Sequence, residues 1–247
     1  MMLRVLGAGL CMGALNYAFM FKGVQYATAS TGSVAIQLFL PFATILSVVF
    51  LKDKVGWRRF TGIALAFIGV SIIAFAKPDT ADPEARIALG VSLIAMGALL
   101  EAFGAIIIKK LDGFSPFGLL AWFAVIGAIG LWILTFTFED GQREALARAD
   151  RTVAISAILY SAIGGSIIGH STYYWLLQRL PVTIVAASLP LTMVFGVFGG
   201  VLILGDDVNV GLVVGSVLNF LGVGVVVVRN AEKQDINAPS VEPEVRP

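Results

Sequence analysis

A carboxylate lies inside one of the apolar stretches of this sequence, where charged side chains are rare. Glu101 interrupts an otherwise apolar run from Ile87 to Ile108. A charged carboxylate at the centre of a bilayer costs about 2.5 to 3.5 kcal/mol on insertion scales, so Glu101 is expected to face a protein interior or a water-filled cavity. There it could exchange protons or bind a cation. The alternative is a neutral, hydrogen-bonded glutamic acid that holds two helices together.

The only histidine, His170, is predicted to lie at the same depth as this carboxylate. Glu101 precedes Lys109 by eight residues, and His170 precedes Arg179 by nine. At about 1.5 Å per residue, both side chains are expected roughly 12 to 13 Å from the cytoplasmic edge. The two groups would form a titrating pair if their helices adjoin. A lone histidine that only packs against its neighbours is the other interpretation.

Further polar residues are candidates for binding a substrate or a proton. Asn16, Tyr17 and Gln37 lie in the first two predicted spans, and Tyr174 lies close to His170. Each of them could instead form a hydrogen bond across a helix interface. The HExxH and GxxxxGK[ST] patterns do not occur in the sequence, so we expect no metal, no cofactor and no enzymatic activity. An intramembrane enzyme that uses Glu101 and His170 as acid and base remains a less favoured alternative.

The composition places these residues in a membrane protein. Hydrophobic residues make up 58% of the 247 residues and charged residues only 13%, too few to cover a soluble globule. A bilayer core needs about 20 apolar residues per helix, and such spans must be helices because lipid offers no hydrogen-bond partner to an open strand. The sequence therefore predicts an all-α membrane protein with eight transmembrane helices, at residues 5–25, 32–51, 60–76, 87–108, 117–138, 153–177, 183–204 and 210–228.

The basic residues indicate how these spans are oriented. With eight spans, eleven lysines and arginines fall on one side of the membrane and six on the other. The positive-inside rule makes the first side cytoplasmic, so both termini are predicted to be inside the cell. The small net charge of +1 does not indicate a nucleic-acid partner. The expected partners are the lipid bilayer and a small-molecule substrate, and the oligomeric state is left open.

An internal repeat relates the two halves of the sequence. A gapless shift of 153 residues aligns identical residues in both: Gln25 with Gln178, Phe42 with Phe195, Asp53 with Asp206, Gly62 with Gly215, Phe67 with Phe220 and Gly69 with Gly222. The loop KDKVGWRR is strongly basic, whereas its counterpart GDDVNV has no basic residue, which indicates opposite sides of the membrane. We predict an inverted five-helix repeat whose first copy is incomplete, lacking about two helices.

The two matched segments, residues 16–75 and 173–228, resemble the later part of an EamA domain of the drug/metabolite transporter superfamily. Each has a proline inside a span, then an acidic residue, then a Gly-rich last helix. The family usually has glutamate at the acidic position, where this sequence has Asp53 and Asp206. Members typically have ten spans. The resemblance thus implies an EamA-like transporter that lacks the first two helices.

The expected organisation follows from the repeat and this resemblance. An incomplete first EamA-like repeat of three helices covers residues 1–77, a second repeat of five helices covers residues 86–229, and residues 230–247 form a disordered cytoplasmic tail. The resemblance implies a secondary transporter in the bacterial inner membrane. It would move a small metabolite or drug-like molecule by alternating access, with proton coupling or exchange. A non-transporting membrane subunit or degenerate transporter is the main alternative.

Overall fold

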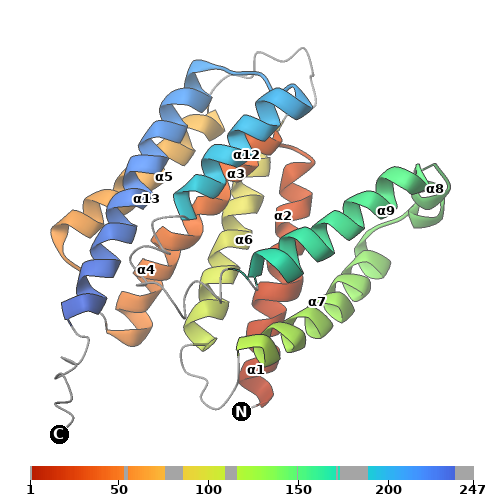
Figure 1. Cartoon of the computed structure of the whole chain (residues 1–247), viewed down its shortest axis with the longest axis horizontal. Coiled ribbons are helices and arrows are strands. Elements are labelled where there is room, and N and C mark those ends of the chain that lie inside the picture. The colour runs from red at the N-terminus through yellow and green to blue at the C-terminus, as the bar shows by residue number, and fades with distance from the viewer. Residues whose placement is uncertain are drawn as a thin grey trace, which may run out of the picture.

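The computed structural model of the chain describes residues 2–52, 55–75, 86–108, 116–148, 150–170, 172 and 189–236, and every regular element within these ranges is a helix. The helices stack into a bundle, and α8 projects from one side together with the adjoining ends of α7 and α9 (Figure 1). The elements are α1 (Met2–Gly9), η1 (Leu10–Leu15), α2 (Asn16–Val24), α3 (Ala29–Ala35), η2 (Ile36–Leu38), α4 (Phe39–Leu51), α5 (Trp57–Phe75), α6 (Ile87–Ile108), α7 (Pro116–Phe138), α8 (Gln142–Arg148), α9 (Arg151–Leu159), η3 (Tyr160–His170), α12 (Leu189–Leu204) and α13 (Val210–Ile236).

Eight apolar helical segments occur in the order that the sequence predicts. Seven are long and apolar enough to cross a membrane, namely Met2–Val24, Ala29–Leu51, Trp57–Phe75, Ile87–Ile108, Phe117–Phe138, Arg151–Gly169 and Val210–Val228. The remaining one, Pro190–Leu204, is shorter, and residues 183–188 of the predicted span lie outside the described ranges. The start of α1 and the end of α13 lie at the same end of the bundle (Figure 1), as an even number of crossings requires. The predicted all-α membrane fold is confirmed.

The first two spans each contain a segment that is not α-helical. In the first, the π-helical segment η1 separates α1 from α2. In the second, the 3₁₀ segment η2 precedes Pro41, which has no N–H group to donate to the carbonyl four residues earlier. This span starts at Thr28, whose hydroxyl accepts a hydrogen bond from the Thr31 amide at 3.2 Å, and it ends at Lys52, which has a left-handed backbone with φ of 58°.

Two helical segments differ from the sequence prediction. The short helix α8 lies in the connection between α7 and α9, outside the eight predicted spans. Helix α13 continues to Ile236, so the predicted disordered tail 230–247 is wrong for residues 230–236. That stretch contains Ala231, Glu232, Lys233 and Gln234, which are strong helix formers and extend the helix beyond the apolar span. Residues 237–247 lie outside the described ranges.

Helix α6 is the central element of the bundle, and it carries Glu101. It contacts α1, η1, α2, α3, η2, α4 and α5. Its buried side includes Ile94 and Ala98, which are fully buried in a cluster with residues of α3, α5, α12 and α13. Because α6 is surrounded in this way, a polar group on it is positioned by packing from several neighbours.

Helices α5 and α13 cross with their backbones in close contact, and the crossing is symmetric. A Cβ atom at Gly69 would lie 2.5 Å from the carbonyl oxygen of Gly215, and one at Gly222 would lie 2.5 Å from the carbonyl oxygen of Gly62. The repeat offset exchanges Gly69 with Gly222 and Gly62 with Gly215, so it converts one contact into the other. A local twofold axis therefore relates the two helices.

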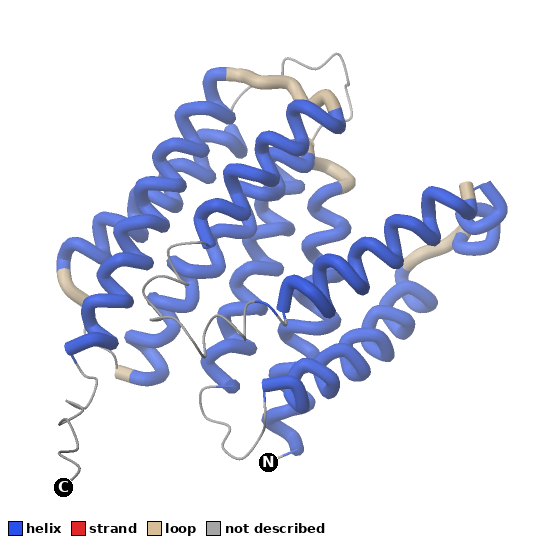
Figure 2. The backbone as a smooth tube through the Cα atoms, viewed as in Figure 1, coloured by secondary structure: helices blue, strands red, loops and turns tan. Residues whose placement is uncertain are grey.

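The directions of the chain agree with this local axis. Helices α5 and α13 run antiparallel, and the loops that precede them lie at opposite ends of the bundle (Figures 1 and 2). At the centre of the crossing, the Asn219 Nδ2 group donates to the carbonyl oxygen of Ala66 at 3.2 Å, and these two residues are also 153 positions apart. Parallel copies of the repeat would not bring matched residues together in this way.

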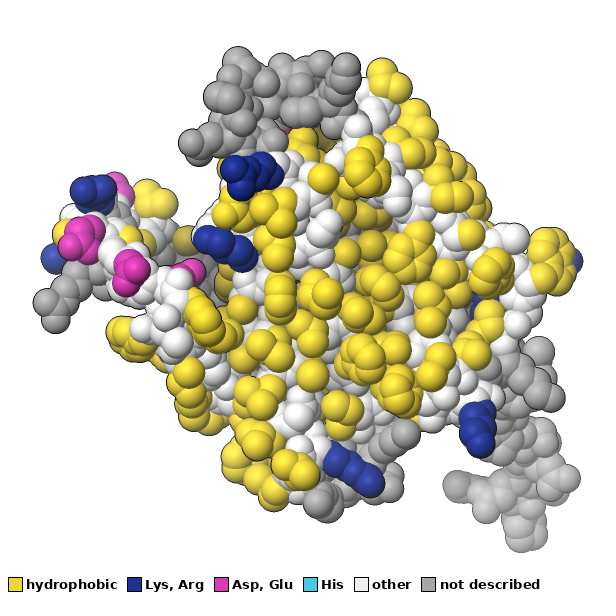
Figure 3. Space-filling model, turned by 180° about the vertical axis from the view of Figure 1, so that it is seen from behind, with side chains coloured by type: hydrophobic (Ala, Val, Ile, Leu, Met, Phe, Trp, Pro, Cys, Tyr) yellow, Lys and Arg dark blue, Asp and Glu magenta, His cyan; other side chains and the backbone are white. Residues whose placement is uncertain are grey.

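The continuous helix formed by α9 and η3 contrasts with the rest of the bundle. None of its residues with a described side chain is buried. Figure 3 shows the back of the molecule, where a broad hydrophobic surface covers the bundle and the charged side chains gather at its ends and on the projecting part. Such a surface is typical of a protein that contacts lipid.

Candidate functional site

The structure brings two of the predicted residues together in the middle of the spans. The Asn16 Nδ2 group donates a hydrogen bond to Oε2 of Glu101, with an N···O distance of 3.2 Å. Asn16 is only 6% exposed, and its Oδ1 atom is buried without a hydrogen-bond partner in the described structure. The pair thus joins the first span to the central helix α6, and it includes one buried acceptor oxygen that has no partner in the described structure.

The backbone of the first span places Asn16 opposite Glu101. The Asn16 amide donates to the carbonyl oxygen of Cys11, the i to i−5 pattern of the π-helical segment η1. Segments of this kind re-aim the residues that follow them and often occur at functional sites. On α6, Gly97 lies one turn before Glu101, and a Cβ atom there would be 3.0 Å from the Asn16 carbonyl oxygen. The glycine therefore lets α2 approach α6 closely.

Tyr17 and Gln37, two further predicted site residues, lie on elements that contact α6 and differ in burial. Tyr17 follows Asn16 on α2, it is 41% exposed, and its ring centroid lies 5.8 Å from that of Phe21. Gln37 is buried in η2, which packs on α6. The structure therefore places four of the six predicted site residues on or around α6.

The other two predicted residues are not placed by the structure. The backbone of His170 ends η3, but its side chain is not described, and Tyr174 lies outside the described residues. The titrating pair of Glu101 and His170 stays a prediction. One hydrogen-bond partner of Glu101 is Asn16, which sequence reasoning named as a candidate without linking the two.

Sequence reasoning missed one polar contact near an end of the bundle. Asp206, predicted in a loop and found in one, accepts a hydrogen bond from the Ser30 amide with an N···O distance of 2.7 Å. The sequence feature that could have indicated this contact is the cluster of threonine and serine from Thr28 to Thr31, which is typical of a helix start. A carboxylate at such a start accepts from amide groups that have no partner within the helix.

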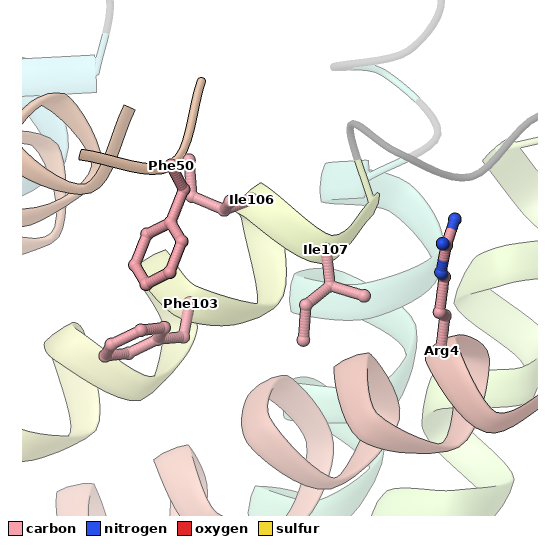
Figure 4. A pocket seen from close by; sticks show the side chains of 5 residues that line it. All are labelled: Arg4, Phe50, Phe103, Ile106 and Ile107. Atoms are coloured by element: carbon pink, nitrogen blue, oxygen red, sulfur yellow. The ribbon is translucent and has the colours of Figure 1, made fainter. Parts of the chain in front are cut away.

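A pocket opens between α1, α4 and α6 at the end of the bundle where the chain begins. Its volume is about 280 Å³, and it is lined by Arg4, Phe50, Phe103, Ile106 and Ile107 (Figure 4). The lining is apolar except for Arg4, whose side chain stands apart from the two aromatic rings (Figure 4). None of the predicted site residues lines it.

Comparison with known proteins adds to this geometry. The profile of the EamA-like transporter family matches residues 1–75 and 88–228. An uncharacterized transporter of Archaeoglobus fulgidus is 26% identical, over 91% of this chain and 77% of that protein. A probable amino-acid metabolite efflux pump of Salmonella typhimurium is 26% identical, over 88% of this chain and 74% of that protein. A protein of Escherichia coli with the same description is 25% identical, over 88% of this chain and 74% of that protein. Because the family profile covers most of its length, the chain belongs to the EamA-like transporter family.

Proposed function

We propose that this chain is a secondary transporter that moves a small metabolite or drug-like molecule by alternating access, with Asn16 and Glu101 at its binding site. Membership of the EamA-like transporter family supports transport in general. The observation that carries the site is the hydrogen bond between Asn16 and Glu101, which places a carboxylate and an amide on facing helices well inside the spans. Transporter sites commonly lie near this depth.

The chemistry of the pair favours a substrate with a protonated amine. An ionised carboxylate pairs with an ammonium group, and the Asn16 side chain holds this carboxylate in place by donating to its Oε2 atom. The descriptions of two relatives name amino-acid metabolites, and amino acids themselves carry such an amine. We therefore propose small amine-bearing metabolites as the substrate class. Protonation of Glu101 would release the amine, which couples its movement to that of a proton.

The two halves of the chain provide the parts that move. We assign residues 1–77 and 86–229 to two inverted EamA-like copies, and the matches of the family profile at 1–75 and 88–228 support this division. We also assign the chain to the bacterial inner membrane with both termini in the cytoplasm, on the distribution of its basic residues. Fusion of a reporter that fluoresces only in the cytoplasm to Pro247 tests this orientation. Fluorescence is expected, and a dark fusion at normal expression contradicts it.

Transport in proteoliposomes with an imposed pH gradient tests the site. A mixture of radiolabelled amino acids is offered to the wild-type protein and to the variant Glu101→Gln, and both uptake and internal pH are followed. A glutamine keeps the size and the hydrogen-bonding ability of the side chain but cannot exchange a proton. We expect gradient-driven accumulation to fall at least about tenfold, which corresponds to a loss of 1.4 kcal/mol of coupling.

The matched control is Glu144→Gln, the same substitution on the exposed helix α8. It should transport like the wild type. A folded Glu101→Gln variant with unchanged, pH-dependent transport would show that the site is elsewhere. A wild-type protein that moves none of the offered amines would contradict the substrate class and favour the alternative of a non-transporting subunit.

A further inference from the structure

The Ser30–Asp206 contact joins two parts of the chain that are far apart in sequence. Asp206 lies in the loop between α12 and α13, and its Oδ2 atom accepts from the Ser30 amide at 2.7 Å. The Ser30 hydroxyl group donates to the carbonyl oxygen of Val197 on α12 at 3.2 Å. Ser30 belongs to the proposed first copy, whereas Val197 and Asp206 belong to the second. Two hydrogen bonds therefore tie the copies together at one end.

The carboxylate in this contact is held in a favourable electrostatic position. Ser30 lies in the first turn of α3, where amide groups have no partner within the helix and the helix dipole attracts negative charge. The Asp206 amide donates to the carbonyl oxygen of Gly200 at 3.0 Å, which fixes the loop beneath the carboxylate. A charge-assisted bond of this kind is about twice as strong as a neutral one.

The helices at this contact fit together through small residues. A Cβ atom at Gly200 would lie 2.5 Å from the Oδ2 atom of Asp206 and 2.8 Å from the Ser30 amide nitrogen. Deeper along the same interface, a Cβ atom at Gly196 would lie 2.6 Å from the Cβ atom of Ser33. The interface between α3 and α12 is therefore closed, and Ser33 lies behind the Ser30–Asp206 contact.

We propose that the Ser30–Asp206 contact is a latch that keeps this end of the transporter closed. Alternating access requires the two copies to separate at each end in turn, and a contact between copies must break when its end opens. The latch is at the end opposite to the start of α1 and the end of α13 (Figure 1). On the proposed orientation it closes the outer side. This inference rests on the proposed alternating-access function.

Thiol labelling tests the latch without requiring transport. Cys11 is the only cysteine, so Cys11→Ser combined with Ser33→Cys leaves a single thiol behind the latch. The rate at which a membrane-impermeant maleimide modifies this thiol is measured in intact cells. Removing the carboxylate with Asp206→Ala should raise the rate about tenfold, because the closed state loses a charge-assisted hydrogen bond. Asp206→Asn, which keeps an acceptor oxygen, should give a smaller increase.

A steric variant tests the same contact without changing any charge. Gly200→Ala places a methyl group against the Asp206 carboxylate and the Ser30 amide, so it should also raise the labelling rate. The matched control is Gly199→Ala, because a Cβ atom there meets no other atom within 4 Å. Asp207→Ala is the control for charge. Both controls should label at the unmodified rate.

The outcomes separate the latch from the proposed binding site. Equal labelling rates in Asp206→Ala and the parent protein, at an unchanged melting temperature, would overturn the latch. If Asp206→Ala does not fold, the comparison of Gly200→Ala with Gly199→Ala decides in the same way. Faster labelling in the latch variants together with full transport by Glu101→Gln would keep the latch and reject the binding site.

Discussion

The α5–α13 crossing and the continuous α9–η3 helix represent two extremes of packing in helices that are both long and apolar enough to span a membrane. In the apolar window of Trp57–Phe75, 39% of the residues are buried within the protein, and the same share is buried in Val210–Val228. In Arg151–Gly169 the share is 0%. Apolar character therefore marks a span in each case but does not indicate which helices hold the bundle together.

The difference between these regions lies in where small residues face one another. Lipid is as apolar as a leucine side chain, so helices in a membrane associate through close packing rather than through the hydrophobic effect. At the α5–α13 crossing, glycines of both helices meet at matched positions, which lets backbone atoms touch. The α9–η3 helix also contains Gly164 and Gly165, but a Cβ atom at Gly165 would meet no other atom within 4 Å. Glycine content alone is therefore not a packing signal.

The largest expected effect comes from filling the α5–α13 crossing. In Gly69→Ala the new methyl group would lie 2.5 Å from the Gly215 carbonyl oxygen, and backbone atoms can yield only if the helices move apart. We expect the free energy of unfolding in detergent to fall by about 1 to 3 kcal/mol. Gly222→Ala is the equivalent substitution under the local twofold axis, and it should lower the free energy of unfolding by a similar amount.

Gly224, which lies on α13 with Gly222, provides the control for both substitutions. A Cβ atom at Gly224 meets no other atom within 4 Å, so Gly224→Ala should be neutral or stabilising by up to about 1 kcal/mol through helix propensity. Equal losses in Gly69→Ala and Gly224→Ala would show that the crossing is not the tight contact described here.

A smaller effect is expected from the polar group at the centre of this crossing. Asn219 is fully buried and donates one hydrogen bond to Ala66, but its Oδ1 atom has no partner in the described structure. Asn219→Leu removes both the bond and the unsatisfied oxygen. Because hydrogen bonds between helices in a membrane average about 0.6 kcal/mol, we expect unfolding free energy to change by less than about 1 kcal/mol. A loss above 2 kcal/mol would mean that Asn219, rather than the glycines, determines the crossing.

The sequence predicted the spans well because hydropathy and length decide them. The fourth predicted span agrees with α6 at both ends, and Glu101 was correctly expected on it. Its contact with Asn16 could not be predicted, because the two residues are 85 positions apart and their meeting depends on the rotation of two helices. The π-helical segment before Asn16 and the glycine at position 97 set that rotation, and hydropathy contains no information on either.

The internal repeat identified residues that pack against each other, which the composition of the spans could not do. The 153-residue offset identified Gly62, Gly69, Gly215 and Gly222 as matched glycines, and in the structure these residues lie at the close approach of α5 and α13. The Ser30–Asp206 contact was missed because the second span was predicted to begin at residue 32, so that Ser30 fell in a loop. A start one turn earlier, at the threonine cap, would have placed an unpaired helix amide at Ser30.

The smallest effect on stability is expected for a substitution on the α9–η3 helix. This substitution tests the region of the comparison that packs least against the rest of the protein. Ile158 is 66% exposed, so Ile158→Ala removes little packing within the described structure, and lipid or detergent fills the space of the lost side-chain atoms. Exposed substitutions usually change stability by no more than about 0.5 kcal/mol, and we expect the unfolding free energy in detergent to change within that range. The matched substitution Ile73→Ala, at a side chain that is 4% exposed against α13, should cost clearly more because it leaves a cavity. A loss above about 1 kcal/mol for Ile158→Ala would mean that the helix is covered in the folded protein, because only packing makes a truncated side chain costly in lipid or detergent.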